Sequence, residues 1–146
     1  MVKIRKAEKE DFNEIAKILM KESSKPPYNE KYTLKISLKE VNNLSKDELY
    51  VAEDKKNILG FIASGITPDN KKKAYINELW LKSASQGKGI GKLLVNFIEK
   101  FYKKKGVKTV RLVSKTNSKA FGFYKKLKYK EYKEMVFMEK KIWKQI

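Results

Sequence analysis

The chain contains no cysteine and no histidine among its 146 residues. Without cysteine it can form no disulfide, no thiolate nucleophile and no cysteine-based zinc or iron–sulfur site. Without histidine it has neither a serine–histidine–aspartate triad nor an imidazole general base. Acid–base chemistry is therefore left to Glu, Asp, Tyr, Lys and the chain termini.

Long apolar runs and arginine are also scarce. No run approaches the roughly 18 apolar residues of a membrane span, and the segment from Met1 to Lys6 is charged, so we expect a cytoplasmic protein without a membrane partner. Arginine occurs only as Arg5 and Arg111, yet 35 basic residues against 17 acidic ones give a net charge of +18. From Glu99 onward, 16 basic and 4 acidic residues contribute +12 of that total.

A strongly basic surface attracts anions, which include nucleic acids and nucleotide-like cofactors. Recognition of base edges and phosphates relies on arginine, so nucleic acid is not our expected partner, and a nucleic-acid- or ribosome-associated binding module is the alternative function. Tyr102 precedes a run of lysines and lies off the apolar stripe of its helix, so we expect it at the surface. A solvated lysine surface explains the charge equally well.

Apolar periodicity predicts alternating strands and helices. Strands are expected at residues 2–7, 49–53, 58–64, 74–81, 107–113 and 132–142. Helices are expected at residues 8–20, from residue 90 to the lysines before Gly106, at 117–127, and briefly near 37–43. A long loop, residues 21–35, carries Tyr28 and Tyr32. This order favours a single α/β domain spanning residues 1–146.

Three glycines lie within five residues of the segment Gln86-Gly87-Lys88-Gly89-Ile90-Gly91-Lys92, between a predicted strand and the strongest predicted helix. Small residues let the backbone approach an anion, and a helix N-terminus supplies unpaired N–H groups. Leu93 stands where a Walker A loop needs Ser or Thr, and Lys92 stands where a dinucleotide fingerprint needs its last Gly. We therefore favour an anion-binding turn over a purely structural one, although neither an NTPase nor a Rossmann dehydrogenase fits.

The pattern Gln86-x-x-Gly89-x-Gly91 resembles the cofactor motif of the GNAT superfamily of acetyl-CoA-dependent N-acyltransferases. Residues 117–127, which begin with Asn and contain a Phe-Tyr pair, are similar to a later helix of that family, and the element order agrees over nearly the whole chain. The resemblance implies an α/β fold with a mixed sheet, splayed central strands and flanking helices. It also implies acetyl transfer from acetyl-CoA to a primary amine, without a metal.

The resemblance assigns roles to particular residues. The acetyl-CoA diphosphate would rest on the loop formed by Gln86, Gly87, Lys88, Gly89, Ile90, Gly91 and Lys92. The pantetheine arm would pair with Leu79, Trp80 and Leu81, and a backbone N–H there would polarise the thioester carbonyl. Asn117 would contact this arm, with a helix N-cap as the alternative.

Two side chains are candidates for catalysis. Tyr124 would be the general acid that protonates the leaving CoA thiolate and would also contact the cofactor, whereas its spacing alone favours a core aromatic. Glu78 lies in an otherwise apolar or amide strand, where a raised pKa would suit a general base. Alternatively, Glu78 forms a salt bridge to a lysine, and an ordered water acts as the base.

The acceptor is left open by the sequence. Its pocket is expected between the 21–35 loop and the far end of the Glu78 strand, and a peptide N-terminus, a lysine, a polyamine or another small amine would all suit it. Without cysteine, direct attack in a ternary complex is the simplest route. Lys128 replaces a usual family glycine at a position suited to positive φ. A homodimer is a further expectation that the sequence leaves open.

Overall fold

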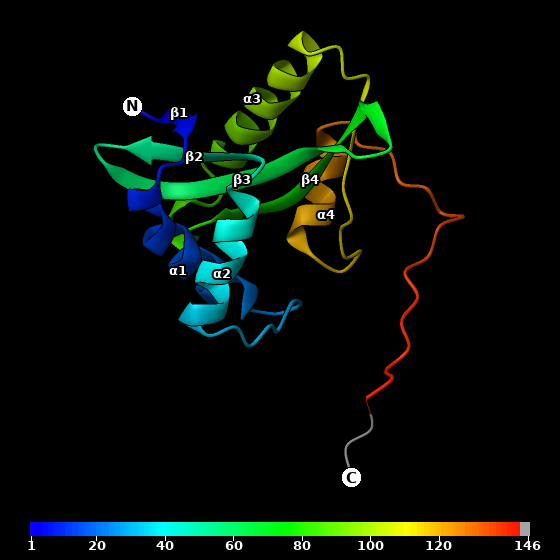
Figure 1. The fold of residues 1–146 in the computed structure, drawn as a ribbon, viewed down its shortest axis with the longest axis horizontal. Coiled ribbons are helices and arrows are strands. Elements are labelled where there is room, and N and C mark those ends of the chain that lie inside the picture. The colour runs from blue at the N-terminus through cyan, green and yellow to red at the C-terminus, as the bar shows by residue number, and fades with distance from the viewer. Residues whose placement is uncertain (144–146) are drawn as a thin grey trace.

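The computed structural model describes residues 1–143 and contains a five-stranded sheet in the order β1-β2-β3-β4-β5 (Figure 1). The strands are β1 (Lys3–Lys6), β2 (Glu48–Asp54), β3 (Asn57–Thr67), β4 (Asn70–Leu81) and β5 (Thr109–Arg111). The helices are α1 (Phe12–Ser23), α2 (Leu34–Leu44), α3 (Ile90–Lys104) and α4 (Lys119–Lys126), with short 3-10 turns η1 (Lys9–Asp11) and η2 (Ser83–Ser85). The first four strands pair antiparallel and β4 pairs parallel with β5, which confirms the expected mixed α/β sheet.

The sheet separates two apolar layers. Successive residues of a strand point to opposite faces, so β2 supplies Leu49 and Val51 to one layer and Tyr50 and Ala52 to the other. Helices α1 and α2 pack on the first face, whereas α3 and α4 pack on the second (Figure 1). None of the helices within residues 1–143 is both long and apolar enough to cross a membrane.

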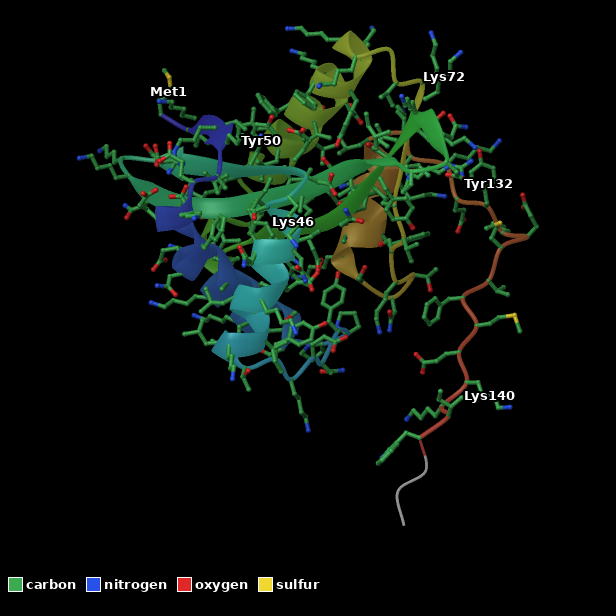
Figure 2. All side chains as sticks on the ribbon, in the orientation of Figure 1. Met1, Lys46, Tyr50, Lys72, Tyr132 and Lys140 are labelled. Atoms are coloured by element: carbon green, nitrogen blue, oxygen red, sulfur yellow. The ribbon has the colours of Figure 1, made fainter. Side chains whose placement is uncertain are left out.

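The C-terminal part departs from the sequence prediction. The strand expected at 107–113 is only three residues long, and the strand expected at 132–142 does not form. Between Tyr132 and Lys140 the chain runs away from the sheet (Figure 2), and Phe137 is 84% exposed. A docked strand would find only a short β5 to pair with, and so would gain few backbone hydrogen bonds.

Two residue-level expectations are also wrong. Tyr102 is 1% exposed rather than a surface residue, because the apolar face of α3 is broad enough to bury it. Its hydroxyl lies 2.8 Å from the Ser64 hydroxyl of β3. The N-cap of α4 is Ser118, whose hydroxyl accepts a hydrogen bond from the Phe121 N–H at 3.3 Å, so Asn117 is not the cap. The long loop is shorter than expected, since α1 extends to Ser23 and α2 begins at Leu34.

Candidate active site

The two central strands separate partway along their length. Strands β4 and β5 pair over three residue pairs, the last of which is Tyr75–Arg111. Beyond that pair, a pocket of about 230 Å³ opens between residues 76–80 and 112–115. A β-bulge stands at its edge, because Ser64 pairs with Ile76 while Ala63 pairs with Glu78. Bulges bend a strand and redirect its side chains, which places Glu78 directly after the point where β4 leaves its partner.

Four segments of the chain line this pocket. They are the end of β4, the residues after β5, the helix α4 and the loop between α1 and α2. The loop contributes Tyr28, whose ring meets the Trp80 ring edge-on with 4.9 Å between their centroids. The structure thus brings Tyr28, Glu78, Leu79, Trp80 and Tyr124 together, whereas Tyr32 does not line this pocket, and the use of the pocket by an acceptor stays a prediction.

The Glu78 carboxylate is largely withdrawn from water. Burial raises its pKa from 4.5 to about 7, the Trp80 Nε1–H opposes this by donating to Oε2 at 3.1 Å, and the charges of Glu40 and Glu30 add to the rise. Within residues 1–143, no lysine or arginine nitrogen lies within 4.0 Å of this carboxylate, so the salt-bridge alternative is wrong. Near neutral pH, such a group can accept a proton from a bound ammonium.

Tyr124 is both a core aromatic and a pocket residue. It is 7% exposed, and its ring packs against Phe123 and Tyr129 with centroid distances of 5.1 and 5.4 Å. Burial raises the pKa of its phenol, and the nearby Tyr28 and Glu78 raise it further. The hydroxyl therefore keeps its proton throughout the physiological range.

The glycine-rich turn places consecutive backbone amides at the start of α3. Gly87 and Gly89 have φ of 76° and 80°, which side chains rarely tolerate, and a Cβ on Gly91 would lie 3.2 Å from the Phe123 ring. In the described part of the chain, none of the six amides from Gly87 to Lys92 donates to a protein acceptor, and the first to do so is that of Leu93, to the Gly89 carbonyl at 3.1 Å. Consecutive free N–H groups at a helix N-terminus can hold a phosphate.

Not every predicted residue reaches the pocket. Asn117 is exposed and does not line it, and the side chains of Lys88 and Lys92 are exposed in the turn. Leu81 does not line it either and instead lies beside the turn, since its Cδ1 is 3.6 Å from a Cβ placed on Gly91. Contact of Asn117 with a cofactor therefore stays a prediction.

Sequence reasoning missed the wall formed by the residues after β5. Ser114, Lys115 and Ala120 line the pocket, and the Lys115 ammonium donates to the Pro27 carbonyl at 3.5 Å, which joins this wall to the α1–α2 loop. The only signal in the sequence was the place of Ser114 and Lys115 directly after the strand predicted at 107–113 and the place of Ala120 in the helix predicted at 117–127.

Comparison with known proteins agrees with this geometry. A family model described as Acetyltransferase (GNAT) family matches residues 8–129. PaiA N-acetyltransferase from Thermoplasma acidophilum, solved in complex with coenzyme A, is 31% identical, with 87% of this chain and 88% of that chain covered at a TM-score of 0.67. A transcriptional regulator from Bacillus halodurans C-125 is 25% identical over 95% of this chain and 99% of that chain, with a TM-score of 0.77. A possible acetyltransferase from Clostridium difficile 630 shares the fold at 20% identity, covering 97% of this chain and 99% of that chain with a TM-score of 0.82. The curated protein sequences contain no match.

Proposed function

This chain belongs to the acetyltransferase (GNAT) family, and we propose that it transfers the acetyl group of acetyl-CoA to a primary amine by direct attack in a ternary complex. The observation that carries the proposal is the run of free amides from Gly87 to Lys92 beside a pocket that holds Glu78 and Tyr124. The coenzyme A bound to the PaiA structure supports the same cofactor here.

The diphosphate of acetyl-CoA would accept hydrogen bonds from the amides of residues 87–92. Among residues 1–143, nothing pairs as a strand with the β5-facing edge of β4 beyond Tyr75, so the pantetheine arm can add there as an extra strand along Leu79 to Leu81. This course delivers the thioester to the pocket, where a β4 N–H stabilises the developing oxyanion. Asn117, at the approach to α4, is the proposed side-chain contact to the same arm.

In the proposed reaction the acceptor arrives as an ammonium and gives one proton to the Glu78 carboxylate. The neutral amine then attacks the thioester carbonyl carbon, a C–N bond forms, and the C–S bond breaks. Tyr124 protonates the departing thiolate, the new amide nitrogen returns its second proton to the Tyr124 phenolate through solvent, and Glu78 releases the proton it accepted to bulk water. Burial raises the pKa of Tyr124, which keeps the phenol protonated until the thiolate forms, and the same pocket raises the pKa of the thiol, which narrows the gap between proton donor and acceptor.

The carboxylates near the pocket favour an acceptor that carries positive charge. Burial is the main cause that raises the pKa of Glu78 and of Tyr32, and the charges of Glu30 and Glu40 raise both further. These two glutamates come from the α1–α2 loop and from α2. We therefore place the acceptor site there. A small amine, a polyamine, a lysine and a peptide N-terminus are the candidates.

The decisive experiment measures acetyl-CoA binding and then turnover. Saturating acetyl-CoA, at about 100 times its dissociation constant, should stabilise the fold by about 2.7 kcal/mol, which a thermal melt detects. ATP at the same concentration controls for general attraction of anions to a chain of net charge +18. A panel of amines with a thiol-release readout then identifies the acceptor. No stabilisation beyond that given by ATP would contradict the proposal.

A further inference from the structure

A buried carboxylate outside the pocket joins the two substrate sites. Glu22, in the last turn of α1, is 5% exposed. Both of its oxygens accept from the Lys25 ammonium at 3.1 Å. The Ser83 hydroxyl donates to the same two oxygens at 3.2 and 3.0 Å, and the Gln86 side-chain amide donates to one of them at 3.3 Å. One acidic side chain thus has three partners from two distant parts of the sequence.

Two of these partners belong to the cofactor side. Ser83 lies in η2, directly after β4, and Gln86 is the first residue of the glycine-rich turn. The Gln86 amide also donates to the Leu81 carbonyl at 3.4 Å, so it links the end of β4 to the start of the turn. Holding Ser83 and Gln86 in place therefore sets the position at which the run of free amides begins.

The third partner belongs to the acceptor side. The Lys25 carbonyl accepts from the Tyr28 N–H at 3.0 Å, which sets the turn that carries the Tyr28 ring to Trp80. The Lys25 ammonium also contacts the Ser83 hydroxyl directly. Glu22, Lys25 and Ser83 therefore form one closed cluster between the loop over the acceptor pocket and the turn that holds the phosphates.

Fold stability alone is a weak reason for such an arrangement. Removing a carboxylate from water is costly, and a well-packed apolar side chain at the same place is often at least as stable as an ion pair. The exposed pair of Glu14 with Lys82, at 3.8 Å, already connects α1 to the residue after β4 without this cost. What Glu22 adds is a fixed geometry for donors from both substrate sites.

We propose that Glu22 is a positioning residue that holds the cofactor turn and the Tyr28 loop in register. The inference rests on the proposed function and extends it, since it says how the two sites are kept at a fixed spacing. It predicts that one substitution at Glu22 disturbs both sites at once. Substitution of Ser83 should disturb mainly the cofactor site, and substitution of Lys25 should disturb mainly the acceptor site.

The test uses Glu22→Gln in a Trp143→Phe background, where Trp80 is the only tryptophan. Calorimetry should show coenzyme A binding weakened about tenfold, as expected for hydrogen bonds to a charged group. Acrylamide quenching of Trp80, measured without ligand, should increase because Tyr28 no longer covers that ring. Ser83→Ala should weaken coenzyme A binding alone, and Lys25→Gln should mainly increase the quenching.

Glu14→Gln is the matched control, since it makes the same change on the same helix at an exposed position. It should leave both measurements as in the background protein. Should Glu22→Gln fail to fold, the separate effects of Ser83→Ala and Lys25→Gln still decide the matter. Unchanged coenzyme A binding together with unchanged Trp80 quenching, in the Glu22 or partner variants, would overturn this inference and leave the proposed function standing. Absence of coenzyme A binding in the background protein would overturn the proposed function as well.

Discussion

Burial acts on the two candidate catalytic residues in the same direction but with different chemical results. It raises the pKa of the Glu78 carboxyl to about 7, where a base can both accept and release a proton. It raises the pKa of the Tyr124 phenol away from neutrality, which keeps that group an acid. A single pocket thus suits both proposed roles, base and acid, without any histidine.

Replacing Tyr124 by Phe should lower turnover by about 100-fold, because the leaving thiolate loses its proton donor. The ring still fills the same space between Phe123 and Tyr129, so the melting temperature should change little. Acetyl-CoA binding, followed by calorimetry, serves as the control and should stay near the wild-type value. Full turnover of the Phe variant at every pH would remove Tyr124 from the mechanism.

Replacing Glu78 by Gln should abolish the acidic limb of the pH–rate profile. In the wild type, turnover should rise with pH through about 7 as the carboxyl loses its proton and becomes a base. The Gln variant retains an acceptor for the Trp80 Nε1–H but has no group that titrates there. An acidic limb that survives in the variant would assign the base to another group, such as an ordered water.

Replacing Glu78 by Gln should impair turnover but stabilise the fold at alkaline pH. A carboxyl whose pKa rises from 4.5 unfolded to about 7 folded costs the native state free energy as pH increases through that window. The full cost, present above pH 7, is about 3 kcal/mol. Glu78→Gln should therefore melt higher than the wild type at pH 8, with the difference shrinking at pH 5.

At the scale of secondary-structure elements, several residues with positive φ stand at helix ends. Gly89 caps α3 at φ 80°, where a Cβ costs about 1–2 kcal/mol. Gly89→Ala should therefore lower the melting temperature and raise the dissociation constant of acetyl-CoA, because the amides after it shift. Gly122→Ala is the matched control. No atom lies within 4 Å of its new Cβ, so the variant should gain about 1 kcal/mol of α4 stability and keep its affinity.

At the end of α4, a substitution to glycine, rather than away from it, should stabilise the fold. Lys128 follows the helix at φ 74°, so the left-handed cap foreseen from the family pattern is present but carries a lysine. The Tyr129 N–H closes this cap by donating to the Tyr124 carbonyl at 3.0 Å. Lys128→Gly should stabilise the protein by about 1 kcal/mol in denaturant unfolding, with little change in turnover. A destabilised glycine variant would show that the lysine side chain outweighs the backbone strain.

Elements with regular apolar patterns were predictable from the sequence, and elements that depend on a partner were not. The stripe of α3 and the glycines after Gln86 define a helix and its turn from local residues alone. The sequence wrongly predicted a surface position for Tyr102, because the hydroxyl that meets its own inside the core belongs to Ser64, 38 residues away. The Glu22 cluster left no local signal, since Ser83 and Gln86 reach it only once β4 is packed beside α1.

At the scale of the whole molecule, the positions of Arg5 and Tyr102 in the structure change what the net charge of +18 implies about partners. Arg5 donates to Asp11 at 2.7 and 2.9 Å and to Glu53 at 2.7 and 3.0 Å, so one of the two guanidinium groups serves the fold. Tyr102, the aromatic that stood beside the lysine run, is buried. Both observations weaken the nucleic-acid alternative, since they remove one of its two bidentate groups and the stacking group that stood beside the lysines.

The segment after Tyr132 gives the molecule an exposed apolar stretch that water does not favour. Met135, Val136, Phe137 and Met138 are each at least 75% exposed, and β5 has a strand partner on one side only within the described residues. Exposed apolar chain near an open sheet edge promotes pairing between copies. The sequence-based expectation of a homodimer therefore gains a concrete surface.

We expect the protein to self-associate with increasing concentration, and the double variant Val136→Lys with Phe137→Lys to remain monomeric. Two added lysines in the apolar stretch oppose burial there and repel a second, similarly charged copy. Sedimentation velocity over a concentration series measures the difference. Ile36→Lys, which charges a 50% exposed residue on α2, is the control and should associate like the wild type. A wild-type chain that stays monomeric throughout, or a double variant that associates equally, would place this segment outside any interface between copies.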